Sequence, residues 1–324
     1  MNILDRKGLR QAATSRLLDA GYDPRRLMVI HTGVSLGAAL LVAVVSYILQ
    51  QKIATTGGLS GIGLRSVLST AQSFLQLLMI VLAPFWEIGM IYAAIRLARG
   101  QFAKPEDLTE GFRRFGSVLR LKLLQLFLYS SLAMPCLYVS LGIFGATPLS
   151  ADFQALMMPV LEQAMEKGQQ IPMDAAGIEE MTQTMLPLIP IFLAVYLAVL
   201  LPLVYRLRMA EYMIMDGTRS ALGAMVASWR MTRKKAGALL RLDLSFWKFY
   251  VLLGLVSVLA YGDKLLEALG VNLPMSEDGA YFLFYAVYIL GTLAVYWCFG
   301  AHLHTTYALA YEELCTPPKD GCAQ

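Results

Sequence analysis

The sequence predicts an all-α protein: a polytopic transmembrane helix bundle of six spans, with further helices at the cytoplasmic surface. Three observations predict it. The chain of 324 residues is 57% hydrophobic and only 15% charged, whereas soluble domains contain about 25% charged residues. Its apolar residues form long runs, each with the roughly 20 residues that a helix needs to cross a bilayer. These runs are continuous and do not alternate with polar residues as barrel strands do, which favours helices.

The six runs define the expected domains. The spans are expected at residues 27–50, 69–97, 118–145, 186–215, 244–262 and 280–312. The sixth run outlasts the bilayer, and its end, HLHTTYALAYEEL, is expected to continue as a helix into water. The transmembrane domain is therefore residues 27–312, with an external loop at 148–185, an N-terminal amphipathic segment at 1–26 and a tail at 313–324. The first 26 residues are polar, so no cleavable signal peptide is expected.

Basic residues predict the orientation. All but four of the 27 Lys and Arg residues lie before the first span, in or beside the segment that joins the second and third spans, in or beside the segment that joins the fourth and fifth, or in the tail. The exceptions are Lys52, Arg65, Lys167 and Lys264. Because basic loops stay in the cytoplasm, both termini are expected there and residues 148–185 outside. Termini on one side require an even number of spans, which favours six.

Two stretches suggest an internal duplication. GSVLRLKLL at 116–124 resembles GALLRLDLS at 237–245, and each follows a proline-containing span and a basic loop. Each loop has the pattern of an amphipathic helix, at about 106–117 and 218–233, which would lie in the membrane interface. Parallel repeats of this kind occur in transporters. They also occur in scaffolds, so the repeat does not by itself decide the function.

Glu87 is the most informative intramembrane residue, because a carboxylate within a span is costly and usually functional. It follows Pro84 in the second span, and the fourth span carries two candidate partners, Arg206 and Arg208. Glu211, also in the fourth span, completes the candidate polar site. Three interpretations remain open: a structural ion pair or hydrogen-bonded protonated acid, a substrate or proton site, or a shallow position near the interface.

The start of the fifth span gives two further hypotheses. Arg241 and Asp243 lie at its cytoplasmic mouth, either as edge anchors or with Asp243 pairing with a basic residue of another helix. A dense basic cluster lies just before them and is a candidate site for anionic lipids, with a topology signal as the alternative reading. Its residues are Trp229, Arg230, Arg233, Lys234, Lys235 and Arg241.

No cofactor, metal site or catalytic motif is predicted. His302 and His304 are two residues apart, so on a helix they point to different faces, and the Cys315–Cys322 spacing is loose for zinc. The external stretch SADFQALMMPVLEQAMEKG has the apolar spacing of an amphipathic helix, and its methionines suggest adaptable packing. Nothing indicates binding of nucleic acid.

Several stretches together resemble the DUF975 family of bacterial integral membrane proteins, distantly similar to membrane domains attached to glycerophosphodiester phosphodiesterases. They are LDRKGLRQAATSRL, PFWEIGMIYAAIRLARGQ, DLTEGFRRFG, EYMIMDG, SWRMTRKKAGALLRLDLSFWKFYVLLG and TTYALAYEEL. Trp247-Lys248 stands where the family has Gly-Trp. The resemblance implies a six-span protein of the bacterial cytoplasmic membrane with unknown activity, and it supplies no catalytic residues.

Two functions follow as expectations. The first is a non-enzymatic protein that organises membrane lipids, especially anionic ones, or a membrane-protein partner in envelope homeostasis. The alternative is a transporter or lipid translocator with a site near Glu87 between spans two and four. A water-accessible cavity around Glu87 would favour the alternative, whereas a solid bundle with lipids on its basic face would favour the first.

Overall fold

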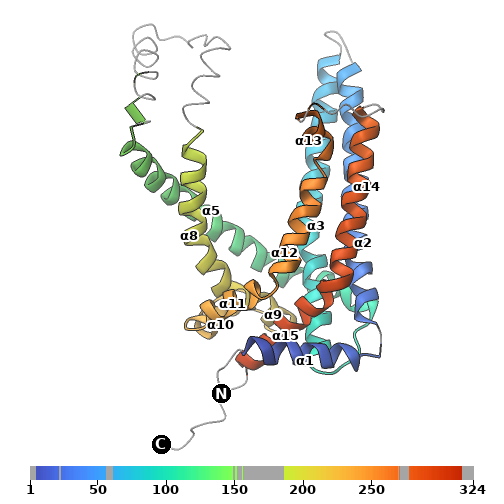
Figure 1. The fold of residues 1–324 in the computed structure, drawn as a ribbon, viewed down its shortest axis with the longest axis vertical. Helices are drawn as coiled ribbons and strands as arrows, with labels where there is room; N and C mark the ends of the chain where they lie inside the picture. The colour runs from blue at the N-terminus through green and yellow to red at the C-terminus, as the bar shows by residue number, and fades with distance from the viewer. Residues whose placement is uncertain are drawn as a thin grey trace, which may run out of the picture. The chain divides into compact units, whose positions relative to one another are not determined.

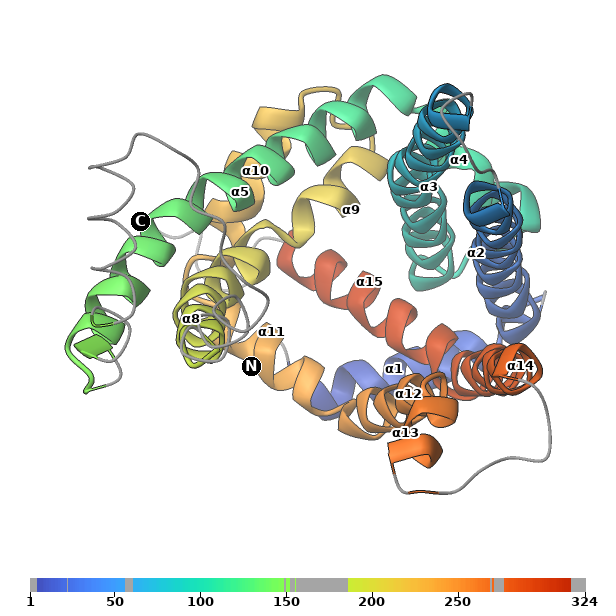
Figure 2. The same ribbon diagram turned by 90° about the horizontal axis from the view of Figure 1, so that it is seen from above.

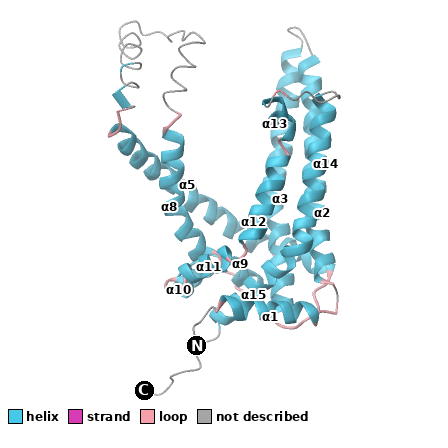
Figure 3. Cartoon of the chain, viewed as in Figure 1, coloured by secondary structure: helices cyan, strands magenta, loops and turns pink. Residues whose placement is uncertain are grey.

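The protein is helical throughout the part that the structure describes. The computed structural model describes residues 5–21, 23–55, 61–148, 150–151, 155, 186–268, 270 and 277–315. Every regular element in these residues is a helix, which confirms the predicted all-α class (Figure 3). Most of the expected external loop and the end of the expected tail lie outside the described residues.

The described helices fit a multi-pass membrane protein. Five helical stretches are long and apolar enough to span a bilayer, and there are six if a bent pair counts as one span. The five stretches are Pro24–Lys52, Ser66–Ala98, Phe115–Gly145, Leu188–Met215 and Phe282–Cys315, and the bent pair is Ala236–Leu244 with Trp247–Leu259. The positions agree with the six predicted runs, except at the last two.

The chain forms two compact units. One comprises residues 1–121 and 208–324, and the other residues 122–207. The first unit contains α1 (Arg6–Leu18), α2 (Pro24–Thr55), α3 (Gly61–Ala98), η1 (Pro105–Thr109), α4 (Glu110–Arg113), the start of α5 (Phe115–Gly145), α9 (Met209–Met215), α10 (Ala221–Thr232), α11 (Ala236–Leu244), α12 (Trp247–Leu259), α13 (Gly262–Ala268), α14 (Glu277–Val295), η2 (Tyr296–Gly300) and α15 (Ala301–Cys315). The second contains the rest of α5 and α8 (Leu188–Leu207).

The long helices α2, α3, α12 and α14 stand side by side in the first unit (Figures 1 and 2). Leu27 and Met28 of α2 pack with Met90, Ala93 and Leu97 of α3 at one end of this group. Farther along α2, α3 and α14, many large apolar side chains are exposed. Such a surface is expected where lipid, and not water, covers the protein.

The stretch predicted to form the first interfacial helix instead packs against α3. It consists of a 3₁₀ turn, η1, followed by the single turn α4. Its predicted apolar face exists, because Leu108 is buried and both Phe112 and Phe115 stack on Phe85 of α3, with ring centroids 5.7 and 4.5 Å away. That face packs against α3, and the stretch at 106–117 is a 3₁₀ turn followed by a single helical turn and not one continuous amphipathic helix.

Two glycines allow this close packing. A Cβ atom on Gly89 of α3 would lie 1.8 Å from the carbonyl oxygen of Leu108, and one on Gly111 of α4 would lie 1.9 Å from that of Phe85. The two backbones therefore approach each other reciprocally, in a manner that no residue with a side chain permits.

The end of the sixth predicted span does not extend into water. The chain changes direction at the π-helical turn η2, and α15 then runs across one end of the first unit between α1 and α3 (Figures 1 and 2). Tyr307, Ala308 and Tyr311 of α15 are buried. The sequence TTYALAY is thus a core helix, because α1 and α3 cover the faces that solvent was expected to reach.

The fifth predicted span is broken at its beginning. Helix α11 ends at Leu244 and α12 begins at Trp247, with an angle of 61° between them. The stretch RLDLSF occupies the end of α11 and the bend. Helix α12 alone is therefore shorter than the predicted 244–262, and α13 follows it from Gly262.

Three ion pairs, made by two arginines, fix the ends of these helices. Arg96 pairs with Asp107 at 2.7 Å, and Asp107 also accepts a hydrogen bond from the backbone N–H of Lys104. Arg99 pairs with both Asp216 and Glu312 at 2.7 Å, so it connects the end of α3 to the end of α15 and to the turn after α9. Burial lowers the pKa of Arg99, but hydrogen bonds and charge from these two carboxylates raise it above its ordinary value.

The described part of the second unit consists of most of α5 and of α8. Each of these helices contains an internal proline. Within this unit, Tyr196 of α8 donates a hydrogen bond to the carbonyl of Tyr129 at 3.3 Å, and buried Ser140 donates to the carbonyl of Cys136. Pro135 and Pro202 lie inside α5 and α8. Bonds of this kind satisfy polar groups in a low-dielectric surrounding.

Candidate functional site: a polar cavity among the helices of the first unit

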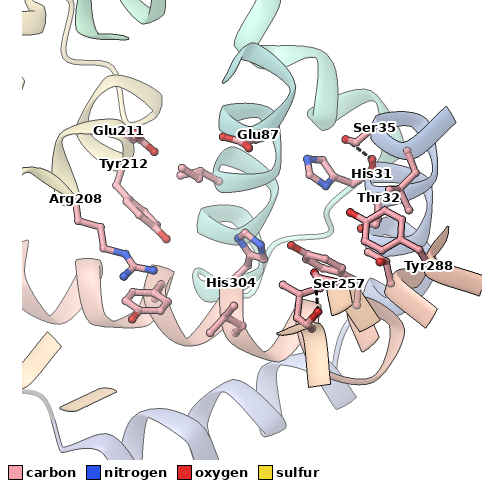
Figure 4. A pocket seen from close by; sticks show the side chains of 17 residues that line it. His31, Thr32, Ser35, Glu87, Arg208, Glu211, Tyr212, Ser257, Tyr288 and His304 are labelled. Atoms are coloured by element: carbon pink, nitrogen blue, oxygen red, sulfur yellow. Dashed lines mark hydrogen bonds between the residues drawn. The ribbon is translucent and has the colours of Figure 1, made fainter. Parts of the chain in front are cut away.

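A cavity of about 440 Å³ lies among the helices of the first unit. Charged, hydroxyl and imidazole groups from several helices point into it (Figure 4). Its polar lining consists of His31, Thr32, Ser35, Glu87, Arg208, Glu211, Tyr212, Ser257, Tyr288, Thr292, Tyr296, His304 and Tyr307, and its apolar lining of Leu36, Ile91, Leu253 and Leu303. A polar cavity beside apolar spans is a typical solute-binding or ion-binding arrangement in membrane proteins.

Glu87 reaches the cavity from α3. Pro84 lies inside this helix, three residues earlier, and the helix continues through it. Glu87 is 11 residues before the end of α3, which at 1.5 Å per residue places it about 16 Å along the helix from that end. The carboxylate shares the cavity with one of its two predicted partners, Arg208, and with Glu211 of the predicted polar site. Arg206 is half-buried in α8 and is not among the lining residues.

Arg208 is held at the cavity by Asp243. Arg208 is the residue immediately before α9. Its guanidinium donates a hydrogen bond to the carboxylate of Asp243 in α11 at 2.6 Å. The other carboxylate oxygen accepts hydrogen bonds from the hydroxyls of Tyr250 in α12 and Tyr307 in α15. The guanidinium also lies over the Tyr307 ring, 3.7 Å from its centroid.

Asp243 is thus the centre of a polar cluster that joins four helical segments. Its relative exposure is 7%. It pairs with a basic residue of another segment, as one of the two hypotheses for this position proposed. Arg241 is exposed and has no ion-pair partner among the described residues.

Three buried polar side chains of the lining have no hydrogen-bond partner in the described part of the protein. Both ring nitrogens of His31 are unpartnered, as are the hydroxyls of Thr32 and Thr292. The His31 ring is stacked on Trp86, whose indole N–H donates to the carbonyl of His31 at 2.9 Å. A buried polar group without a partner is costly. Water or a polar ligand in the cavity would give these groups hydrogen-bond partners.

The two histidines of α15 have separate environments. His304 lines the cavity. His302 lies against α1, where its Nε2 atom is 3.2 Å from the Thr14 hydroxyl and 3.1 Å from the carbonyl of Arg10. Among the described residues, no group of three or more His, Cys, Asp and Glu side chains is placed to hold a metal ion.

The predicted lipid cluster lies on α10, α11 and the turn between them. Arg230, Arg233 and Lys234 are exposed, Lys235 is half-buried, and Trp229 is partly exposed at 38%. In the described residues none of these four basic side chains has an ion-pair partner. Helix α10 starts at the Ser220 cap and buries Ala221, Ala224 and Met225. The cluster is therefore on the solvent-facing or lipid-facing side of a helix that is packed on the protein.

Sequence reasoning missed much of the lining. Four lining residues are polar but lie inside apolar runs of the sequence: His31, Thr32, Tyr288 and Thr292. Polar residues are costly inside a span, so their presence there is the signal that could have identified them.

No family model, curated protein or solved structure matches the chain.

Proposed function

We propose that this chain is a non-enzymatic transporter of the bacterial cytoplasmic membrane that binds a small, amine-bearing polar solute in the cavity around Glu87. The observation that supports it most is the cavity itself, with its charged lining and unpartnered buried hydroxyl and imidazole groups. A protein that only organises lipids has no need for such a cavity. The likeness to DUF975 proteins in the quoted stretches agrees with a multi-pass protein of this membrane.

The chemistry of the lining favours an amine. Two carboxylates, Glu87 and Glu211, line the cavity with one guanidinium, Arg208, and Arg208 already pairs with Asp243. Carboxylates accept charge-assisted hydrogen bonds from ammonium groups, so an amine on the solute would find acceptors in this lining. Hydroxyl and imidazole groups nearby supply further hydrogen bonds for a polar or zwitterionic solute.

The size of the cavity favours a small solute over a whole lipid. Ligand pockets measure about 300–1,000 Å³, and this one measures about 440 Å³. A phospholipid with two acyl chains does not fit such a volume, although its headgroup would. Both termini face the cytoplasm in this proposal, because the basic loops do so under the positive-inside rule.

The experiment is a thermal-shift screen of the purified protein against small amines, zwitterions, sugars and carboxylates, followed by uptake of the hits into proteoliposomes. We expect amine-bearing solutes to raise the unfolding temperature of the wild type and to be taken up. Glu87→Gln should weaken binding of the same solute by about tenfold, because a charge-assisted hydrogen bond becomes a neutral one.

Glu106→Gln is the matched control, since Glu106 is an exposed carboxylate outside the cavity. It should bind the solute as the wild type does. Stabilisation by no amine-bearing solute, or equal loss in both variants, would contradict the proposal.

The organisation of membrane lipids or partner proteins is a second candidate function, and one observation supports it. The exposed basic residues of α10 and α11 lie where they could attract anionic lipids or an acidic partner protein, as each nearby Lys or Arg contributes about 1 kcal/mol of attraction to an anionic leaflet. Organisation of lipids or partners in the envelope is therefore the alternative, and the solute screen separates it from transport.

A further inference from the structure

A second hollow, of about 600 Å³, lies in the first unit away from the Glu87 cavity. It is bounded by α4, the beginning of α5 and the turn between α9 and α10. Four arginines surround it: Arg113, Arg114, Arg120 and Arg219. Gly116, Ser117, Ile214, Gly217 and Thr218 complete the lining.

The hollow is held open by polar contacts between segments distant in sequence. Arg114 donates a hydrogen bond to the carbonyl of Ile214 at 2.7 Å. Ser117 donates one to the carbonyl of Arg219 at 3.3 Å. Gly217 has φ of 110°, a left-handed conformation that favours glycine. These contacts fix the backbone segments that carry the arginines, and they hold the Arg114 side chain in place.

The hollow carries excess positive charge. Glu110 is the acidic partner of Arg113 and Arg114, at 3.2 and 3.5 Å. Arg120 and Arg219 are exposed and have no ion-pair partner among the described residues. Asp216, the nearest acid in the adjoining turn, pairs with Arg99. Four guanidinium groups therefore face one carboxylate in a concave surface.

Guanidinium groups bind phosphate in a bidentate, charge-assisted manner. The hollow also lies at the N-terminal end of α5, which has 31 residues and whose dipole adds positive potential there. We propose that this hollow binds the phosphate group of an anionic phospholipid.

The position favours a lipid over free phosphate. Arg120 lies near the start of α5, and α5 continues from there as an apolar span. Phe112 and Phe115, next to the hollow in sequence, are 39% and 44% exposed, as aromatic rings are at the boundary of a membrane. A phosphate bound here would sit at headgroup level with its acyl chains in the bilayer. The basic loops place this boundary on the cytoplasmic side, where anionic lipids are found.

The test measures lipid retention by native mass spectrometry of detergent-purified protein, with phosphatidylglycerol and phosphatidylcholine added in equal amounts. The wild type should retain phosphatidylglycerol selectively. Arg120→Gln with Arg219→Gln should reduce that retention by about thirtyfold, since two unpaired charges are lost. Arg120→Lys with Arg219→Lys should retain an intermediate amount, because charge is kept and the bidentate geometry is lost.

Arg6→Gln with Lys7→Gln is the control with the same change in charge, at exposed positions on α1 outside the hollow. It should retain lipid as the wild type does. Equal losses in the two Gln pairs, or no preference for phosphatidylglycerol, would overturn the proposal. Competition by inorganic phosphate as strong as that by the lipid would overturn the assignment to a phospholipid. Because the hollow is separate from the Glu87 cavity, neither result bears on solute binding.

Discussion

At the scale of single residues, the carboxylate of Asp243 has the most consequences. It accepts hydrogen bonds from Arg208, Tyr250 and Tyr307, which belong to three different helical segments. A buried ion pair of this kind adds little net stability relative to apolar residues, but loss of one partner leaves an uncompensated charge. Asp243 therefore sets the position of Arg208 at the cavity as well as the packing of α11, α12 and α15.

Replacement of this carboxylate should be strongly destabilising. We expect Asp243→Ala to lower the free energy of unfolding by about 3 kcal/mol or more, because Arg208 and two tyrosine hydroxyls lose their acceptor. Thermal unfolding in detergent, calibrated by denaturant titration, measures the change.

Arg241→Gln, two residues away and exposed, is the control and should change stability by less than about 0.5 kcal/mol. A stability for Asp243→Ala equal to that of the control would show that the Asp243 cluster does not hold these segments.

At the scale of elements, the contact of α3 with η1 and α4 depends on backbone proximity. Gly89→Ala places a methyl group against the carbonyl of Leu108, and we expect it to destabilise the protein by about 2 kcal/mol or more through overpacking. Gly37→Ala in α2 meets no atom within 4 Å and should be neutral or slightly stabilising. Similar unfolding temperatures for the two variants would contradict the tight contact.

The basic cluster on α10 and α11 gives a prediction of its own. Arg233→Gln, Lys234→Gln and Lys235→Gln together leave many basic residues to set the orientation, so topology should survive. If the cluster binds anionic lipid, co-purified anionic lipid should fall in the triple variant, and what remains should fall further with added salt. Unchanged lipid content with intact topology would mean that the cluster is an orientation signal alone.

The elements also show where sequence reasoning succeeds and fails. Apolar runs located the spans, because length and hydrophobicity are local properties. The bend at Ser245 and Phe246 could not be predicted, because neither proline nor glycine lies at this position in the sequence. The burial of α15 depends on α1 and α3 covering it, which no local pattern encodes. Glu87, Arg208 and Glu211 were found because charge is costly in a membrane, whereas the Arg208–Asp243 pair joins residues 35 positions apart.

At the scale of the whole molecule, the topology determines which side of the membrane each proposed site faces. Both termini should be cytoplasmic and residues 148–185 external, as the basic loops predict. In a variant without its natural cysteines, Met165→Cys should react with an impermeant thiol reagent from outside intact cells. Reaction only after the cytoplasmic side is opened would reverse the orientation, and with it the leaflet proposed for the arginine hollow.

The central claim is that the cavity around Glu87 is open to water within the apolar helices, and cysteine accessibility tests it most directly. Thr292 of α14 lines the cavity and is buried at 4%, while Leu290 on the same helix is 67% exposed on its outer surface. With Cys136, Cys298, Cys315 and Cys322 replaced by Ser, Thr292→Cys should react with a small water-soluble thiol reagent in membranes. Leu290→Cys should not react, because lipid covers it, although both should react after denaturation. Failure of Thr292→Cys to react under conditions that label the denatured protein would contradict a water-accessible cavity.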